Sequence, residues 1–196
     1  MANTRKFDEQ EALKAMQALF WRKGYEATSL SDLVETSGVP RQSLYNTFGN
    51  KEAIFEAAFR HYADSVNGGA ISALDVDSPR QGIPDFFDHI ARANSDPDNP
   101  HGCLRAGSES ELGARDDALG EMIRTSSRKD IAHLTSIFQR WADEGKLANS
   151  ADPEALAALL MSVARGISGL SRAGQDPATI QLAAEGAKAS MVQWVK

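Results

Sequence analysis

The residues best suited to chemistry occupy one short polar run that contains no acid: Arg41, Gln42, Ser43, Tyr45, Asn46 and Thr47. An Arg side chain can donate paired hydrogen bonds to O6 and N7 of guanine, and a Gln side chain can pair with N6 and N7 of adenine. Arg41 and Gln42 are therefore candidates to read base edges. They can do so only if a helix carries them into the major groove, so the surrounding elements decide whether this chemistry is possible.

Further polar residues could hold a phosphate backbone beside this run. Thr28 and Ser29 stand where a helix begins, and hydroxyl groups and free backbone N–H groups there suit a phosphate. Tyr45, Asn46 and Lys51 could contact the backbone on the other side. The alternatives are simple N-capping by Thr28 and Ser29, and burial of Tyr45 as a core aromatic residue.

A second candidate for chemistry is Cys103, the single cysteine. His101 and Arg105 flank it and could favour the reactive thiolate, although a lone cysteine on a helix is more often a small buried apolar residue. The four histidines lack the spacing of a metal site, and neither a nucleophile elbow nor a glycine-rich phosphate loop is present. We therefore expect no metal, no cofactor and no catalytic residue.

The composition is that of an ordinary soluble globular chain, with 196 residues of which 42% are hydrophobic and 24% charged. This composition excludes disordered and collagen-like proteins. A single cysteine cannot form an intramolecular disulfide, which fits a reducing compartment. Residues 1–8 are polar and charged, and no stretch approaches the roughly 18 apolar residues of a membrane span. We expect a cytoplasmic protein with no membrane partner.

The net charge of −6 is unevenly distributed along the chain. Residues 1–62 carry eight basic and eight acidic side chains, whereas the remaining residues carry 13 and 19. Exposed charges that lie further apart than the Debye length of roughly 8 to 10 Å interact weakly. A small positive face can therefore bind DNA although the rest of the protein is acidic, and the overall acidity does not exclude a nucleic-acid partner.

Apolar residues recur at intervals of three and four, and strand-like alternation is missing, so the sequence predicts an all-α protein. Helix-starting residues and glycines divide residues 8–66 into one long, two short and one connecting helix. Residues 75–84 contain two prolines and Gly82 and are expected to form a loop. Five further helices, which make about nine in all, are expected near 84–95, 101–113, 116–145, 153–173 and 177–195.

The two short helices and the turn between them have the pattern of a helix-turn-helix. Ser29 and Asp32 have the spacing of a capping box, Gly38 ends the first short helix, and Pro40 suits the first turn of the second. Six apolar residues face inward at helical spacing and leave the polar run exposed: Leu30, Leu33, Val34, Val39, Leu44 and Phe48.

Two stretches resemble the N-terminal domain of the TetR family of transcriptional repressors: residues 24–29 (GYEATS), followed by Leu33, and residues 38–52 (GVPRQSLYNTFGNKE). The resemblance covers residues 8–62 and implies a three-helix DNA-binding domain, a larger helical ligand-binding and dimerisation domain, and repression relieved by a small molecule. Two departures are Pro40, where a Ser or Thr cap is common, and Asn46, where an aromatic residue or His is common. Positions that commonly contact DNA in the family fall on Thr28, Arg41, Gln42, Tyr45, Asn46 and Lys51.

The resemblance implies a division into a helix-turn-helix domain (1–50), a connecting helix (51–66) and an effector-binding and dimerisation domain (67–196). Within the last domain, periodicity does not separate a pocket from the core, because both are built from the inward faces of helices. The candidate effector-binding residues are Phe86, His89, Ile90, Cys103, Phe138, Trp141 and Arg165.

The last two predicted helices carry apolar stripes that either pack within the chain or meet a second copy. The resemblance implies a four-helix interface in a homodimer, and the candidate interface residues are Leu159, Val163, Ile167, Met191 and Trp194. A two-fold dimer places its recognition helices about 34 to 36 Å apart, one turn of DNA, and so requires a pseudo-palindromic site.

These features predict a ligand-responsive repressor of the TetR type, which binds double-stranded operator DNA as a dimer and is released by a small-molecule effector. Two alternatives remain open. In the first, Cys103 of the same DNA-binding protein senses electrophiles or oxidants, because residues 101–104 (HGCL), with Glu109 and Glu111 after them, resemble a segment of one branch of the family in which some members respond in this way. In the second, the chain is a helical small-molecule-binding protein or enzyme whose N-terminal motif is only structural.

Overall fold

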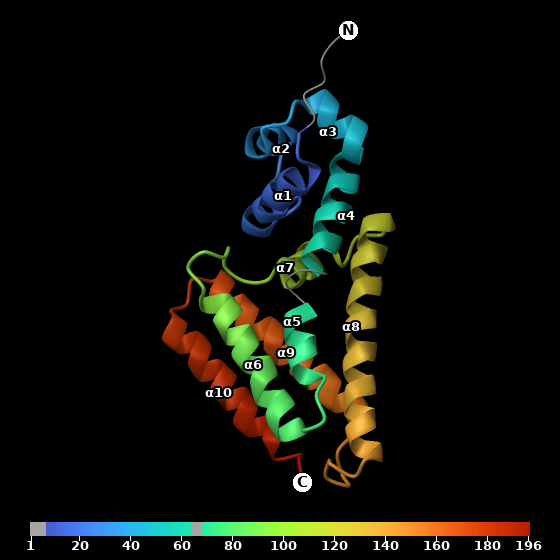
Figure 1. Ribbon diagram of the computed structural model, residues 1–196, viewed down its shortest axis with the longest axis vertical. Helices are drawn as coiled ribbons and strands as arrows, with labels where there is room; N and C mark the ends of the chain where they lie inside the picture. Colours follow the sequence, from blue (N-terminus) through green and yellow to red (C-terminus); the bar gives the residue numbers. More distant parts are fainter. Residues whose placement is uncertain (1–6, 64–67) are drawn as a thin grey trace.

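The computed structural model describes residues 7–63 and 68–196, which form an elongated all-helical molecule (Figure 1). Helices α1 to α4 lie at the end near the N-terminus, α5, α6, α9 and α10 lie toward the other end, and α7 lies between the two groups. The described residues form ten helices: α1 (Glu9–Lys23), α2 (Leu30–Ser37), α3 (Arg41–Phe48), α4 (Lys51–Tyr62), α5 (Gly68–Leu74), α6 (Pro79–Ser95), α7 (Leu104–Leu112), α8 (Ala118–Asp143), α9 (Pro153–Arg172) and α10 (Pro177–Val192).

Local capping residues place the first two helices where the sequence predicts them. The Asp8 carboxylate accepts hydrogen bonds from two backbone N–H groups in the first turn of α1, at 2.9 and 3.1 Å. Ser29 and Asp32 form a complete capping box at the start of α2. Gly38 ends α2 with a φ of 67°, a left-handed conformation that glycine adopts without steric cost. The predicted starts of α1 and α2 are confirmed.

Helix α3 begins without a side-chain cap, because Pro40 occupies the N-cap position. The backbone N–H groups of Ser43 and Leu44 both donate to the Pro40 carbonyl, at 2.9 and 3.0 Å, and close the first turn. The N–H groups of Arg41 and Gln42 precede these bonds, so they are among the groups that the helix itself does not pair. Pro40 therefore lacks the side-chain acceptor that a Ser or Thr cap would supply. No side chain at this position competes with a ligand for the free N–H groups at the start of α3.

The predicted loop over residues 75–84 is wrong in most of its length. An additional helix, α5, precedes it, and α6 begins at Pro79 instead of near residue 84. Pro79 fits the first helical turn, where its missing N–H is not needed. Gly82 lies so near α5 that a Cβ atom there would be 2.6 Å from the Leu74 carbonyl oxygen. The glycine that suggests a loop is thus a packing position where two helices approach closely.

Two hydrophobic cores hold the molecule together. The first lies among α1 to α4, but it also contains four residues from later in the chain: Leu104, Leu112, Leu119 and Ile123. The second lies among α5, α6, α8, α9 and α10, with Phe87, Phe138, Trp141 and Leu160 fully buried. The N-terminal helices therefore depend on α7 and the start of α8 to complete their core.

Helix α9 is more apolar than the sequence analysis predicts. By length and composition it could cross a membrane, with a mean hydropathy of 1.2 over 18 residues. Within the described fold, 44% of that window is buried inside the protein. A core helix of a soluble protein passes the same test, so this helix is weak evidence for a membrane span.

Replacing Asp32 with Asn should destabilise the protein at neutral pH and do so less in acid. Hydrogen bonds from the Lys23 ammonium and from Ser29 hold the pKa of the Asp32 carboxyl well below its usual range. The unfolded chain therefore takes up the proton first, and the stability that Asp32 contributes is lost as the pH falls below about 4. Urea denaturation should show a constant difference between the wild type and Asp32→Asn from pH 7 to about pH 5, and a progressively smaller difference as the pH falls below about 4; an unchanged difference in acid would contradict this account.

Candidate nucleic-acid interface

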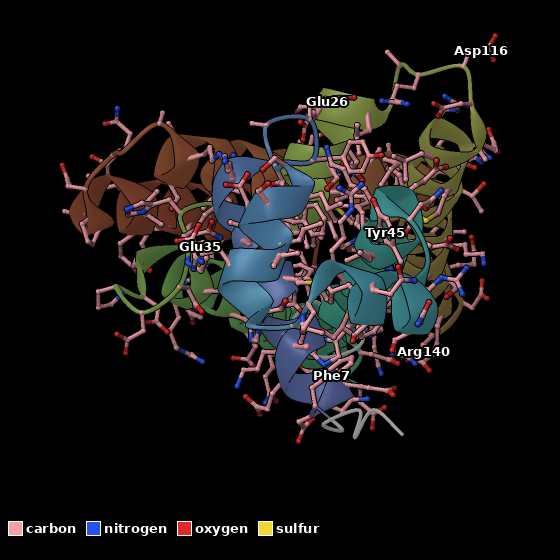
Figure 2. All side chains as sticks on the ribbon, turned by 90° about the horizontal axis from the view of Figure 1, so that it is seen from above. Phe7, Glu26, Glu35, Tyr45, Asp116 and Arg140 are labelled. Atoms are coloured by element: carbon pink, nitrogen blue, oxygen red, sulfur yellow. The ribbon has the colours of Figure 1, made fainter. Side chains whose placement is uncertain are left out.

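Helices α2 and α3 form the predicted helix-turn-helix at one end of the molecule. Leu33, Val39 and Leu44 are buried beneath it. Figure 2 looks onto this end and shows Glu35 on α2 and Tyr45 on α3. The structure leaves four residues of the polar run exposed and two half-buried: Arg41, Gln42, Asn46 and Thr47, then Ser43 and Tyr45. The predicted exposure is confirmed for the first four residues, whereas Ser43 and Tyr45 are less exposed than predicted.

Contacts one helical turn apart hold the exposed side chains of α3 in place. The Arg41 guanidinium lies 5.4 Å from the ring centroid of Tyr45. The Gln42 side-chain amide donates to the Asn46 side-chain oxygen at 3.0 Å. Pairs spaced four residues apart restrict the rotamers of both partners, so these four side chains lose less conformational freedom when they contact a ligand.

The predicted phosphate-binding residues brace the loop before α2 instead of pointing freely outward. Thr28 is fully buried, and its hydroxyl donates to the Gly24 carbonyl at 2.6 Å. The Ser29 hydroxyl is engaged in the capping box with Asp32. The Lys51 ammonium lies 4.3 Å from the ring centroid of Tyr25. Of these three, the Thr28 hydroxyl is the one that a phosphate cannot reach without local rearrangement.

Sequence reasoning missed the residue that joins this loop to the rest of the protein. Glu111, at the end of α7, accepts hydrogen bonds from the backbone N–H groups of Tyr25 at 2.9 Å and Glu26 at 2.8 Å. We call this arrangement the Glu111 bridge. Gly24 is required beside it, because a Cβ atom there would lie 2.9 Å from a Glu111 carboxylate oxygen.

Further contacts between the two groups of helices surround the Glu111 bridge. Arg115 pairs with Glu26 and with Asp117. The Trp21 indole N–H donates to the Gly102 carbonyl at 3.1 Å. The Arg115–Glu26 and Trp21–Gly102 contacts join residues far apart in the sequence and have no local signal, so neither periodicity nor capping patterns could have identified them.

The predicted effector-binding residues separate into two sets. Phe86, Ile90, Cys103 and Arg165 line a small hollow beneath α7. Phe138 and Trp141 are fully buried in the second core and do not line it. His89 is half-buried with its ring against Gly69, and burial lowers its pKa. The last three residues are packing positions, which periodicity does not distinguish from pocket positions.

The two charged residues that flank Cys103 in the sequence have other surroundings in the structure. The Arg105 guanidinium is bound to Asp130 and Ser126, and His101 is exposed beside a different hollow. The contact described for the sulfur is with the Tyr62 hydroxyl, at 3.5 Å. Burial raises the pKa of the Tyr62 phenol, which keeps this neighbour neutral. The geometry does not single out Cys103 as an activated thiolate.

The predicted interface residues also divide by burial. Ile167 and Met191 are 2% and 1% exposed within the single chain, so they fill its core and cannot reach a second copy. Val163 and Trp194 are half-buried. Leu159 is 42% exposed and lies on the outer face of α9. The alternation of apolar residues identifies the helices correctly but not which apolar residues face outward.

Metal binding has no support within the two described ranges, 7–63 and 68–196. No group of three or more His, Cys, Asp or Glu side chains there is arranged to hold a metal ion.

Known proteins are similar to this chain in sequence and in fold. Residues 12–58 match the family "Bacterial regulatory proteins, tetR family", and residues 80–187 match "Tetracyclin repressor-like, C-terminal domain". The chain is 29% identical to the HTH-type transcriptional repressor ComR of Escherichia coli (strain K12), over 86% of this chain and 81% of ComR. It is 30% identical to the uncharacterized HTH-type transcriptional regulator YezE of Bacillus subtilis (strain 168), over 82% and 84%.

A solved structure shows the same arrangement of helices. A cysteine-substituted form of the TetR family transcriptional regulator CifR, complexed with 26-bp double-strand operator DNA, superimposes with a TM-score of 0.88. The sequence identity is 25%, and the match covers 98% of this chain and 100% of the CifR chain.

Replacing Glu111 with Gln should loosen the loop before α2. A Gln side chain has one oxygen to accept a hydrogen bond and no charge, so one of the two N–H groups of the Glu111 bridge loses its acceptor and the other keeps a neutral one, at a cost of about 1 kcal/mol at an exposed site. Amide hydrogen exchange of Tyr25 and Glu26 should become faster in Glu111→Gln. Asp116→Asn, which neutralises an exposed carboxylate in the loop after α7, is the control. Unchanged exchange in both variants would show that the bridge does not order the loop.

Proposed function

Because the chain belongs to the tetR family of bacterial regulatory proteins, we propose that it is a transcriptional repressor that binds a pseudo-palindromic operator as a homodimer and leaves it when a small-molecule effector binds. The observation that carries this proposal is α3, an eight-residue helix with an exposed, acid-free face. Its family consists of transcriptional regulators, and we assign it no catalytic role. We place its action in the cytoplasm, where an operator is accessible.

Recognition of DNA rests on the first turns of α3. Arg41 and Gln42 extend from its N-terminus, the part of a recognition helix that reaches base edges in the major groove. Asn46 lies one turn further along and is already paired with Gln42. Ser43, Tyr45, Lys51 and Ser29 flank this surface and supply donors for phosphates. Arg41, Gln42 and Asn46 therefore read the base sequence, and the flanking residues set the register on the duplex.

A homodimer is supported by the outer faces of α9 and α10. Leu159 on α9 and Leu182 on α10 are the exposed large hydrophobic residues of the described chain, at 42% and 72% exposure. Gly166 and Gly169 on α9 are exposed as well and permit a close helix approach. A two-fold axis through this face places two copies of α3 about one DNA turn apart.

Effector control follows from linkage between two sites. An effector that binds more tightly to a dimer with the wrong separation of its recognition helices weakens DNA binding, and DNA weakens effector binding by the same factor. We place the effector in the domain formed by residues 67–196, next to α7. This helix lines the small hollow beneath it and, through Glu111, contacts the loop before α2.

Replacing Arg41 with Ala should cost about 1 to 3 kcal/mol of operator binding and relax the preference at one base pair. Replacing Lys51 with Ala should weaken binding to operator and scrambled DNA alike and lower the salt dependence by about one unit of slope. Both variants can be compared on a site selected from randomised duplexes and on its scrambled version. An equal loss of Arg41→Ala on the two duplexes would rule out Arg41 as a base reader.

Replacing Leu159 or Leu182 with Lys should shift the protein from dimer to monomer, because each substitution puts a charge into a buried apolar interface. Sedimentation velocity measures the shift directly. Ala132→Lys, at an exposed position on α8, is the matched control and should remain dimeric. If all three variants sediment like the wild type, the interface lies elsewhere on the protein.

A further inference from the structure

Two hollows meet at a shared wall between α7 and α9. The outer one is an open cleft of about 420 Å³ between the end of α1 and helices α7 and α9. The inner one is a small apolar space of about 40 Å³. Five residues line both of them: Cys103, Ala106, Glu109, Arg165 and Ser168. Any group that enters the inner hollow from the cleft must pass this wall.

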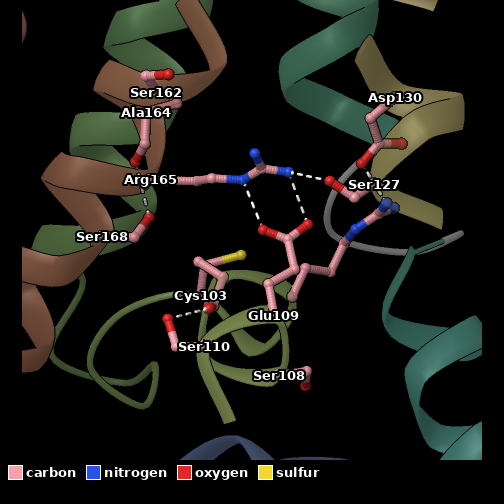
Figure 3. A network of polar contacts seen from close by, with 12 residues as sticks. Cys103, Ser108, Glu109, Ser110, Ser127, Asp130, Ser162, Ala164, Arg165 and Ser168 are labelled. Atoms are coloured by element: carbon pink, nitrogen blue, oxygen red, sulfur yellow. Dashed lines mark hydrogen bonds and ion pairs between the residues drawn. The ribbon is translucent and has the colours of Figure 1, made fainter. Parts of the chain in front are cut away.

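The charged part of the wall is a two-point ion pair, which Figure 3 shows from close by. Arg165 Nε and Nη2 lie 2.6 and 2.7 Å from the two carboxylate oxygens of Glu109. The Arg165 and Glu109 side chains are 29% and 19% exposed, so the pair borders the open cleft. Arg165 Nη2 also donates to the Ser127 hydroxyl at 2.8 Å. Arg165 therefore keeps a partner if Glu109 leaves.

We propose that this ion pair is an exchange site for a small monocarboxylate, whose carboxylate replaces Glu109 on Arg165 and whose short apolar chain occupies the inner hollow. The inference rests on the proposed function, for which it names the chemical class of effector. Arg165 makes two charge-assisted hydrogen bonds before and after the exchange. The displaced Glu109 is solvated in the open cleft, so the burial of the apolar chain drives binding.

The inner hollow determines the polarity and length of the ligand's apolar chain. Its apolar side is formed by Ile71, Phe86, Ile90 and Met161, and these side chains offer no hydrogen bonds to a polar ligand. Its volume of about 40 Å³ admits a short chain and excludes a long one unless the helices move apart. The ligand is thus a carboxylate with a few aliphatic carbons.

The other arginines near the cleft are less suitable. Arg105 lines the inner hollow but not the cleft, and it is buried and already bound by Asp130 and Ser126. Arg172 lines the cleft but not the inner hollow, and it donates to the Trp21 carbonyl at 2.6 Å. An amine would have to displace Arg165 from both Glu109 and Ser127, whereas a carboxylate displaces one flexible side chain.

The exchange also connects the ligand site to the helix-turn-helix through α7. Glu109 and Glu111 lie two residues apart on α7, and Glu111 holds the loop before α2. Releasing Glu109 frees α7 from α9 on one side while the Glu111 bridge remains on the other. A shift of α7 is then transmitted to the start of the helix-turn-helix.

Titration of butanoate, butan-1-ol and butylamine into the full chain, without DNA, tests the proposal. The three probes share one chain length and differ in head group. Chemical shifts of the Cys103 and Ser168 amides, on the shared wall, report binding. We expect saturable binding of butanoate alone, about tenfold tighter binding to Glu109→Gln, which lacks the competing carboxylate, and loss of binding to Arg165→Gln.

A double variant and a control keep the test decisive. Arg165→Gln leaves Glu109 partly buried and unpaired and can destabilise the fold, whereas Glu109→Gln combined with Arg165→Gln is neutral at this position and should still lose butanoate. Arg128→Gln, which removes an arginine with 62% side-chain exposure on α8, should bind like the wild type. Equal responses to all three probes, weaker butanoate binding by Glu109→Gln, or butanoate binding retained by the double variant would overturn the proposal.

Operator affinity, measured separately, distinguishes this proposal from the proposed function. Failure of the butanoate pattern in a protein that binds its operator overturns the exchange site and leaves the repressor. The expected butanoate pattern in a protein without operator affinity supports the exchange site and overturns the repressor.

Discussion

The position of the loop before the helix-turn-helix depends on the Glu111 bridge, which holds this loop from outside the N-terminal helices. One carboxylate accepts the N–H groups of two consecutive residues, Tyr25 and Glu26. Hydrogen bonds to a charged acceptor are stronger than neutral ones, and here they close a contact across more than 80 residues of sequence. The same helix also contributes apolar contacts, because Leu104 and Leu112 of α7 belong to the core of the N-terminal helices.

Helix α7 makes two separate sets of contacts. One face bears Arg105 and Glu109, which pair with Asp130 of α8 and Arg165 of α9. The C-terminal end bears Glu111 and Leu112, which contact the DNA-binding unit. Partly buried ion pairs add little net stability, because desolvation offsets most of their attraction. They fix geometry instead, and the pair of Arg165 with Glu109 holds the nine-residue α7 against α9.

The recognition helix shows the complementary constraint, which is that a reading surface must be ordered before it meets its ligand. The pairs Arg41 with Tyr45 and Gln42 with Asn46 restrict three exposed side chains and the half-buried Tyr45. The loop before α2 is braced by the Thr28 hydroxyl, by Lys51 over Tyr25 and by the Glu111 bridge. Less conformational entropy is then lost when this surface binds its ligand. Because the Glu111 bridge comes from α7, the position of the loop depends on the rest of the protein.

The sequence by itself determined what depends on near neighbours. Asp8, Ser29 with Asp32, and the Asp-Pro pairs before α9 and α10 fix helix starts through bonds within one turn, and the spacing of polar residues on α3 indicated its exposed face. Tertiary structure decided the rest, because the partner of a surface is not encoded locally. Gly82 and Pro79 indicated a loop, whereas Pro79 begins α6 and Gly82 packs against the end of α5. Thr28 was predicted to bind a phosphate, but its hydroxyl is bonded to the Gly24 carbonyl. The role of Glu111 depends on the contact between α7 and the loop before α2.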